Sequence, residues 1–139
     1  MKIDFVDVMR SFYKKSERRG WTRKDLIYLR KYIVERLRGK KFLFLVAEVN
    51  NRILGYATGS IGKKDHRGRK HGEIDEIFVK KNFRGGMVGT VLLNHLIKAM
   101  KKLGVGDFEA EIAIGNERSK KLFRKFGFYE HSLIFVKKK

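Results

Sequence analysis

The first third of the chain spaces its apolar residues with the period of an α-helix. One helix is predicted over Ile3–Glu17, with Asp4 as its N-cap, and a second over Trp21–Leu37, with Thr22 as its N-cap. Apolar residues recur three and four positions apart in both segments, as in helices with one buried face. They are Phe5, Val8, Met9 and Phe12 in the first segment, and Leu26, Leu29, Ile33 and Leu37 in the second.

The middle of the chain has the pattern of β-strands. Phe42–Val49 is nearly continuous in apolar residues, Asn50-Asn51 follows it, and Arg52–Ile61 is the returning stretch. Asparagine tolerates the positive φ that a two-residue hairpin turn requires, so the stretches are predicted to form a hairpin. A loop is predicted over Gly62–Gly72, followed by a third strand, Ile74–Val79, which carries an acidic pair within an apolar run.

Helical and strand patterns alternate in the rest of the chain. A long amphipathic helix is predicted over Val88–Met100, a short strand over Phe108–Ile114, and a second helix after its N-cap, Asn116. Gly127 is expected to end that helix in the left-handed conformation, and Phe128–Val136 is predicted to be extended. Because there is no internal repeat and no linker, a single domain over residues 1–139 is expected.

The composition agrees with one globular domain and excludes several kinds of site. Of 139 residues, 42% are hydrophobic, and no apolar run is long enough to cross a bilayer. The N-terminus lacks the pattern of a signal peptide, so a cytoplasmic location away from membranes is expected. The absence of cysteine excludes disulfides and a thiol nucleophile, and the spacing of the four histidines predicts no metal site.

The formal net charge of +19 suggests which partners the protein can attract. Such a field attracts anions and speeds their capture, within the limit that salt screening sets. It indicates an acidic or nucleic-acid-associated partner, or equally a requirement for solubility. The densest group of cations lies in Gly62–Gly72, which has no aromatic residue for base stacking. Contact with phosphates is therefore the only nucleic-acid role that this segment favours.

A basic, glycine-rich turn joins the strand Ile74–Val79 to the helix Val88–Met100. It reads Arg84-Gly85-Gly86-Met87-Val88-Gly89. A strand, a glycine turn and a helix in this order direct backbone N–H groups, and the positive end of the helix dipole, toward a bound anion. Arg84 adds a forked cation beside them, so the stretch predicts a phosphate-binding turn.

Other interpretations of this turn compete with that prediction. A P-loop is excluded because no Gly-Lys-Ser/Thr follows. The dinucleotide fingerprint GxGxxG is half met by Gly86 and Gly89, with acidic Glu109 about 20 residues on, but Arg84 replaces its first glycine. The turn alone is equally compatible with two glycines that only end a loop before a helix.

A second stretch, Asn116–Phe128, favours the phosphate-binding interpretation. Together with the turn at Arg84, it resembles the GNAT superfamily of acetyl-CoA-dependent N-acetyltransferases. In that family an R/Q-x-x-G-x-G/A turn precedes a helix of the form N-x-x-[AS]-x-x-[LF]-[YF]-x-[KR]-x-G-F. Met87 replaces the usual middle glycine of the turn, and Phe123 replaces a frequent tyrosine. The residues that match are Arg84, Val88, Gly89, Asn116, Ser119, Leu122, Lys125, Gly127 and Phe128.

The resemblance implies an α+β fold and a cosubstrate. The fold would be a central mixed β-sheet flanked by helices, with the first strand reduced to Met1–Ile3 or absent and a minimal C-terminal hairpin. The cosubstrate would be acetyl-CoA. Asn116 can meet the pantetheine amides, act only as a helix cap, or do both. The residues expected to bind acetyl-CoA are Ile77, Phe78, Val79, Arg84, Gly85, Gly86, Met87, Val88, Gly89, Thr90, Asn116 and Ser119.

The resemblance further implies direct attack of an amine on acetyl-CoA. A lysine amine titrates at about 10.4 and an α-amino group at about 8, so a base is needed near neutral pH. Glu76 is the candidate base, and the alternative is a surface carboxylate paired with a lysine. Because Phe123 cannot donate a proton to the departing thiolate, Tyr129, Tyr56 or water is expected to do so. Tyr129 is the candidate catalytic residue for this step.

The predicted function is an N-acetyltransferase whose acceptor is a protein N-terminus, a lysine or a small amine. An acidic or ribosome-associated protein is an expected partner, and nucleic-acid binding and a homodimer are left open. The alternative function is that of a basic nucleic-acid-binding or ribosome-associated protein that keeps the fold without turnover.

Overall fold

The computed structural model describes residues 31, 38–39, 41–50 and 52–139. Of the predicted helices Ile3–Glu17 and Trp21–Leu37, it describes only Lys31, which is helical. The remainder of both helices, and the reduced first strand Met1–Ile3, lie outside the described residues.

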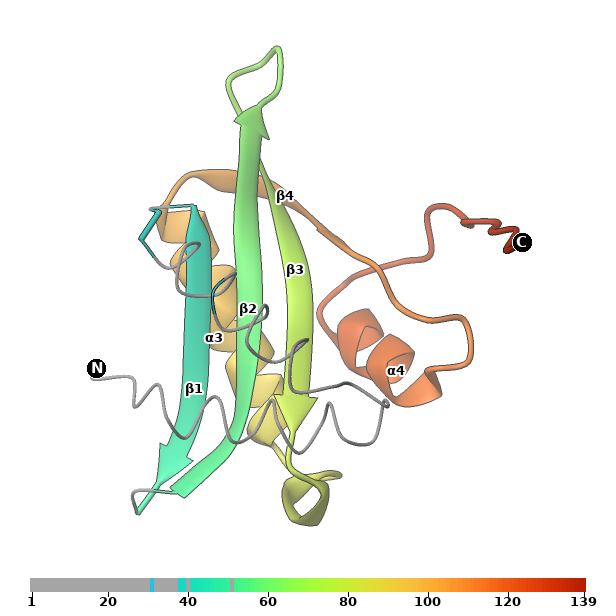
Figure 1. Ribbon diagram of the computed structural model, residues 1–139. Helices are drawn as coiled ribbons and strands as arrows, with labels where there is room; N and C mark the ends of the chain where they lie inside the picture. Colours follow the sequence, from blue (N-terminus) through green and yellow to red (C-terminus); the bar gives the residue numbers. More distant parts are fainter. Residues whose placement is uncertain (1–30, 32–37, 40, 51) are drawn as a thin grey trace.

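The described part of the chain is built on a four-stranded mixed sheet in the order β1-β2-β3-β4 (Figure 1). β1 pairs antiparallel with β2 and β2 with β3, whereas β3 and β4 are parallel. The α+β class and the mixed sheet are therefore confirmed. The strands are Phe42–Val49 (β1), Arg52–Lys64 (β2), Lys70–Val79 (β3) and Val105–Ala110 (β4).

The predicted hairpin at Asn50 forms as expected. Val49 pairs with Arg52, and Asn50 has a φ of 50°, a conformation that asparagine adopts more easily than most residues.

The prediction of a loop over Gly62–Gly72 is wrong for most of these residues. β2 continues to Lys64, β3 begins at Lys70, and the hairpin tip projects beyond the neighbouring strands (Figure 1). The carboxylate of Asp65 organises the tip, because it accepts hydrogen bonds from the backbone N–H groups of Arg67 and Arg69, both at 2.9 Å. The bond from the Arg69 N–H is the main reason why the pKa of Asp65 lies below its usual value. The cationic segment is thus an ordered hairpin end.

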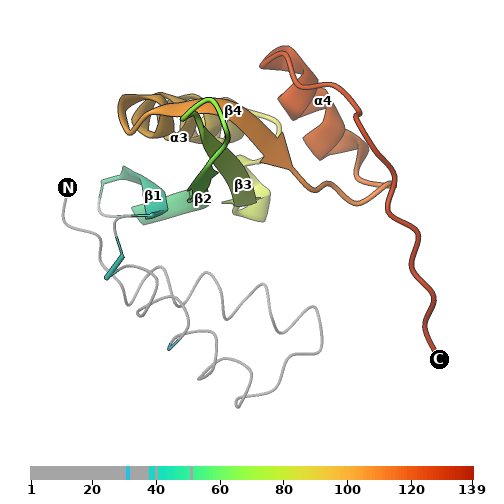
Figure 2. The ribbon, with the colours of Figure 1, turned by 90° about the horizontal axis from the view of Figure 1, so that it is seen from above.

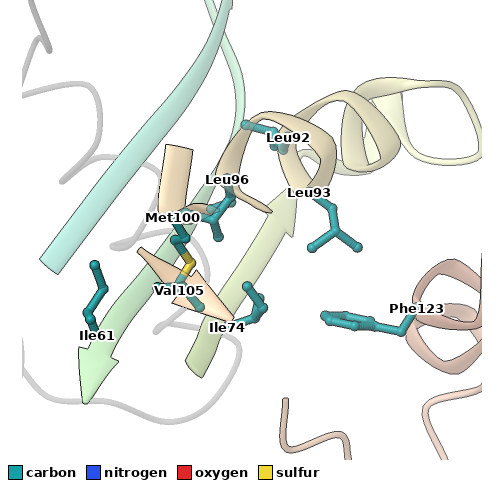
Figure 3. Packing of buried hydrophobic residues seen from close by; sticks show 9 residues of the cluster. Ile61, Ile74, Leu92, Leu93, Leu96, Met100, Val105 and Phe123 are labelled. Atoms are coloured by element: carbon teal, nitrogen blue, oxygen red, sulfur yellow. The ribbon is translucent and has the colours of Figure 1, made fainter. Parts of the chain in front are cut away.

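One face of the sheet is covered by the long helix α3 (Val88–Lys102), as predicted from the apolar spacing in this stretch. Leu92, Leu93 and Leu96 of α3 share one core cluster with Ile74 of β3 and with Phe123, and Figure 3 shows Leu93 directed toward Ile74 and the ring of Phe123. Phe123 belongs to α4 (Glu117–Lys125), so this core joins both helices to the sheet. Within the described residues, no helix is both long and apolar enough to cross a bilayer.

β4 lies earlier in the sequence than predicted. It spans Val105–Ala110 rather than Phe108–Ile114, because Gly104 ends the preceding turn with a φ of 90° and the chain pairs with β3 at once. Pairing with Lys70–Ile74 uses only the part of β3 next to the hairpin tip. Pairing with β3 therefore sets the position of β4, and the apolar residues of Phe108–Ile114 do not.

The C-terminal strand and hairpin predicted over Phe128–Val136 are not formed in this structure. Residues 126–139 are outside any strand, and Figures 1 and 2 both show the tail leaving α4 and running away from the sheet. The segment is apolar enough for a strand, but a strand also needs a neighbour to complete its backbone hydrogen bonds. No strand of the described chain lies beside it.

The approach of β2 to the end of β3 depends on a glycine. A Cβ atom at Gly55 would collide with the carbonyl oxygen of Phe78 and lie 3.1 Å from Cα of Val79. Gly55→Ala is therefore expected to lower the free energy of unfolding by about 1–3 kcal/mol, as other overpacked sites do. Gly62→Ala is the matched control, since a Cβ in that part of β2 would come no closer than 3.5 Å to the carbonyl oxygen of His71. Denaturant unfolding of both variants tests this, and equal losses would contradict it.

Candidate active site

An extra residue in β3 turns two acidic side chains to the same face of the sheet. Thr58 pairs with Glu76 and the next residue of β2, Gly59, pairs with Ile74, so Asp75 is bulged. Ile74 and Ile77 both pack on the α3 side, although they are three residues apart. Glu76 therefore lies on the opposite face, across from buried Thr58. Asp75 lies on that face too, where its carboxylate accepts a hydrogen bond from Ser60 at 3.1 Å.

Aromatic rings line the same face beside Glu76. The ring of Phe78, two residues beyond Glu76, lies 5.4 Å from the ring of Tyr56, and Tyr56 lies 5.5 Å from the ring of Phe44. Tyr56 is fully buried. The candidate base thus sits at the border of an apolar surface, where a carboxylate is less hydrated than in open water.

β3 extends past the strand on its other side. The last pair between β3 and β4 is Ile74 with Ala110, whereas β3 continues to Val79. The described residues place no strand beside this last part of β3, and α4 lies beyond this edge of the sheet in both views of the molecule (Figures 1 and 2). Backbone groups on that edge, around Ile77–Val79, are therefore placed to pair with an extended ligand that carries amides.

Arg84 holds the turn against the end of β3. A short 3₁₀ helix, Lys81–Phe83, follows the strand, and the Nε–H of Arg84 then donates to the carbonyl oxygen of Val79 at 2.8 Å. The guanidinium carbon lies 5.7 Å from the centre of the Phe78 ring, within range of a cation–π contact. These contacts use Nε and one face of the guanidinium, and the side chain is exposed to solvent.

The turn ends at an uncapped helix N-terminus. Met87 occupies the N-cap of α3 without a side-chain hydrogen bond, and the first turn contains no acidic residue. The N–H groups of Val88, Gly89 and Thr90 precede the first intrahelical bond, from Val91 to Met87 at 2.8 Å. They and the helix dipole form an electropositive end that fits a phosphate group.

Only one residue of the turn requires glycine for its backbone conformation. Gly85 has a φ of 82°, which side chains strongly disfavour. Met87, which replaces the glycine usual in the matching motif, has a φ of −88° and a ψ of −5°, an ordinary right-handed conformation, and its side chain is exposed. The methionine therefore fits the turn without backbone strain.

α4 meets the same turn from the side. A Cβ atom at Gly89 would lie 3.5 Å from Cδ2 of Leu122 in α4 and 3.7 Å from Cγ2 of Val79 in β3, so three elements converge there. α4 begins at the predicted N-cap, where the Oδ1 atom of Asn116 accepts from the N–H of Ser119 at 3.2 Å. It ends as predicted at Gly127, whose φ is 84°.

The structure joins the predicted residues of β3 to those of the turn and places Tyr129 in an exposed tail. Ile77, Phe78 and Val79 run directly into the turn Arg84–Thr90 through the 3₁₀ helix. Tyr129 lies in the C-terminal tail, is 80% exposed, and has its ring 6.3 Å from that of His131. Its role as proton donor stays a prediction. Neither Thr58 nor the bulge at Asp75 is predicted from the sequence, although the three-residue spacing of Ile74 and Ile77 is a signal of the bulge.

Comparison with known proteins assigns the family. The sequence model described as the Acetyltransferase (GNAT) family matches residues 6–128. The chain belongs to this family. An uncharacterized N-acetyltransferase (MJ1207) of Methanocaldococcus jannaschii is 32% identical over 66% of the chain, and an N-alpha-acetyltransferase of Sulfurisphaera tokodaii is 30% identical over 74%. The matched parts span 41% and 66% of these two relatives.

The GNAT fold is also seen in solved structures. An aminoglycoside acetyltransferase from an uncultured soil metagenomic sample, in complex with sisomicin, matches with a TM-score of 0.78 at 18% identity. The match covers 96% of this chain and 87% of that one. At this identity the likeness concerns the fold alone.

The cap of α4 can be tested apart from any other role of Asn116. Asn116→Ala removes the acceptor of the Ser119 N–H and is expected to cost about 1 kcal/mol of unfolding free energy. Asn116→Asp keeps an acceptor and should restore stability, as measured by denaturant unfolding. If Asn116 also contacts CoA, the Asp variant will be stable but will bind CoA more weakly by calorimetry. Wild-type stability of the Ala variant would contradict the cap.

Proposed function

We propose that this GNAT protein transfers the acetyl group of acetyl-CoA to a primary amine. The observation that carries the proposal is the uncapped N-terminus of α3, placed by the Arg84 turn beside the part of β3 that extends past β4. The two features suit the two parts of CoA, a pyrophosphate and an amide-bearing pantetheine arm. The family match and the names of the two relatives favour catalysis over a purely nucleic-acid-binding role.

The pyrophosphate would be held by backbone N–H groups and by nearby cations. The N–H groups of Val88, Gly89 and Thr90 have no partner within the helix, and no acidic residue in the first turn repels an anion. Arg84 reaches the turn from the β3 side, and its exposed guanidinium keeps further N–H donors for an oxygen. The net charge of +19 adds long-range attraction for a polyanionic ligand.

The pantetheine arm would lie along the end of β3. Its amides can pair with backbone groups of Ile77 and Val79 in the way that an added strand does. This brings the thioester toward Glu76 and Phe78, where backbone N–H groups can stabilise the negative charge that develops on its carbonyl oxygen.

In the proposed reaction the amine nitrogen attacks the acetyl carbonyl carbon. The new N–C bond forms, the C–S bond breaks, and the nitrogen loses a proton while the departing CoA thiolate gains one. Glu76 would accept the proton, directly or through water, from the sheet face on which it lies. Tyr129, or water in its place, would protonate the thiolate.

The proposal includes three kinds of acceptor, namely a protein N-terminus, a lysine and a small amine. The name of the relative from Sulfurisphaera tokodaii supports an α-amino group as the first acceptor to test, before lysine and small amines. An α-amino group titrates at about 8, so a larger share of it is already neutral near neutral pH than of a lysine, which titrates at about 10.4. We also propose that the protein acts in the cytoplasm. An acetyl-CoA thermal-shift assay, followed by mass spectrometry of an acceptor panel, tests the function as a whole.

The phosphate-binding role of the turn predicts a graded response at Gly89. Gly89→Ala places a methyl group in ordinary contact with Leu122 and Val79 and should leave the fold intact. Gly89→Glu adds a negative charge at the helix N-terminus and is expected to weaken CoA binding by at least roughly tenfold, a loss of about 1.4 kcal/mol. Gly62→Glu is the matched control, because Gly62 is exposed in the β2 strand near the hairpin tip. Calorimetric CoA affinities that are equal in the two Glu variants would contradict the assignment.

The role of Glu76 predicts a change in kcat without a change in affinity. Glu76→Gln keeps the size of the side chain but removes the base, so kcat should fall by roughly 10²–10⁴ while CoA affinity stays the same. Glu73→Gln is the control, since Glu73 is an exposed carboxylate on the same strand. A loss of only a few-fold in kcat for Glu76→Gln, with an unchanged pH profile, would return Glu76 to a surface role.

A further inference from the structure

The tip of the hairpin between β2 and β3, residues 63–70, holds a dense group of cations in a projecting position. The last strand pair between β1 and β2 is Phe42 with Ser60, so the end of β2 extends past β1. Figure 1 shows the tip beyond the rest of the sheet. The tip contains a single acidic residue, Asp65. Its five lysine and arginine residues, of which all but Lys70 are fully exposed, are Lys63, Lys64, Arg67, Arg69 and Lys70.

Asp65 fixes the shape of the tip. Besides two backbone N–H groups, its carboxylate accepts a hydrogen bond from Nε of Arg69 at 3.1 Å and forms an ion pair with Nη2 of the same side chain at 3.0 Å. Backbone bonds close the turn, from the N–H of Asp65 to the carbonyl oxygen of Arg69 and from the N–H of Gly68 to that of Asp65. Within the described part of the chain, no ion pair engages the side chains of Lys63, Lys64 and Arg67.

The C-terminal end of α3 adds two cations beside the tip. Nζ of Lys70 donates to the carbonyl oxygen of Leu103 at 2.9 Å, which ties the base of the tip to the residue that follows α3. The last two residues of α3, Lys101 and Lys102, are exposed. The tip together with Lys101 and Lys102 therefore forms one basic surface, called here the cationic end.

The acidic residues of β4 lie away from this surface. Asp107 and Glu109 contact His71, at 2.9 and 3.4 Å. Phe108 packs on the core under α3, so its two acidic neighbours lie on the opposite face of the sheet. β3 also separates them from β2, which carries Lys63. The attraction of the cationic end for an anion is therefore not cancelled on the α3 side.

The composition of the tip favours a phosphate backbone over a protein as the partner. From Gly62 to Gly72 there is no apolar residue, whereas the core of a protein interface is enriched in aromatic residues and depleted of charge. The lack of aromatic rings also disfavours single strands, which are held by stacking of their bases.

The shape of the tip favours an RNA duplex. In A-form RNA the major groove is deep and narrow, so its two phosphate strands approach each other and side chains do not read the bases there. A compact group of cations can then contact both strands from outside. In B-form DNA the same groove is wider, and its phosphate strands lie farther apart.

We propose that the cationic end binds the phosphate backbone of double-stranded RNA across its major groove. Lys63, Lys64 and Arg67 contact phosphates on the two strands, and Lys101 and Lys102 extend the contact along one of them. Binding of this kind carries no sequence preference, and it weakens steeply with salt because each contact releases counterions.

This proposal does not depend on the proposed acetyl transfer. The cationic end and the turn at Arg84 lie at opposite ends of β3 (Figure 1). β3 has 10 residues, so the two ends are roughly 30 Å apart. CoA affinity is therefore an independent measure of folding in every variant of the tip, and a wild-type chain that fails to bind CoA leaves the prediction for RNA unchanged.

Removal of two charges from the tip tests the contact. Fluorescence anisotropy with a labelled RNA duplex of about 16 base pairs gives the Kd at several salt concentrations. Lys63→Gln/Lys64→Gln should raise the Kd by at least roughly fivefold and lower the salt slope by about two. Lys137→Gln/Lys138→Gln removes the same charge from the exposed C-terminal tail and should stay near the wild-type Kd. Equal losses in the two double variants would overturn the proposal.

A pair of substitutions at Asp65 separates the shape of the tip from its charge. Asp65→Asn and Asp65→Ala both make the chain more positive, but only asparagine keeps an oxygen that can accept from the N–H groups of Arg67 and Arg69. The Asn variant should bind the RNA duplex at least as tightly as the wild type, and the Ala variant more weakly. Tighter binding by both variants would show that net charge alone attracts RNA, which would overturn the proposal.

Competition identifies the anion that the cationic end prefers. Unlabelled RNA duplex, DNA duplex of the same sequence, single-stranded RNA and polyglutamate are compared at equal charge concentration. The RNA duplex should displace the labelled RNA most strongly. Equal displacement by all four would indicate unspecific attraction, and stronger displacement by polyglutamate would indicate an acidic protein partner. Either result, or a preference for DNA or single strands, would overturn the proposal.

Discussion

The bulge at Asp75 is the constraint on which the candidate site depends. It lets Ile74 and Ile77, three residues apart, both pack under α3, so β3 keeps its place in the core on both sides of the irregularity. The same extra residue turns Glu76 and Phe78 to the other face, beside Tyr56 and Thr58. Without it, period-two alternation would send Glu76 into the apolar core with Ile74, where an ionised carboxylate is costly. Packing of the core and the position of the candidate base therefore have one cause.

The end of β3, the turn at Arg84 and the start of α3 are held together by local contacts. Gly55 allows β2 to approach β3 closely, Arg84 ties the turn to the carbonyl oxygen of Val79, and Gly85 supplies the positive φ that lets the chain reverse into the helix. The helix then begins without a side-chain cap from Met87, and its first N–H groups have no acceptor within the helix itself. Such a helix end is costly unless water or an anion meets it, and this is the physical reason to expect a phosphate there.

Several parts of this arrangement could be predicted because their cause is local. The apolar spacing of α3, the hairpin at Asn50, the cap of α4 at Asn116 and its end at Gly127 all follow from residues within a few positions of one another. The bounds of β3 and β4 could not be predicted in the same way. The cationic residues near Asp65 look like a loop, yet most are strand, since pairing between β2 and β3 and the carboxylate of Asp65 order them. The C-terminal segment has the composition of a strand but lacks a neighbouring strand in the described chain.

The sequence by itself determined the helices α3 and α4, the glycine turn between β3 and α3, and the family, because helix periodicity, capping and glycine turns depend on contacts between near neighbours. Only the tertiary structure decided which face Glu76 occupies, where β4 separates from β3, and that Met87 is tolerated in the turn. It also decided that Tyr129 lies in an exposed tail and that α4 meets the turn through Leu122 and Gly89. These features depend on the register between segments far apart in the chain, and a shift of one residue reverses every side chain of a strand.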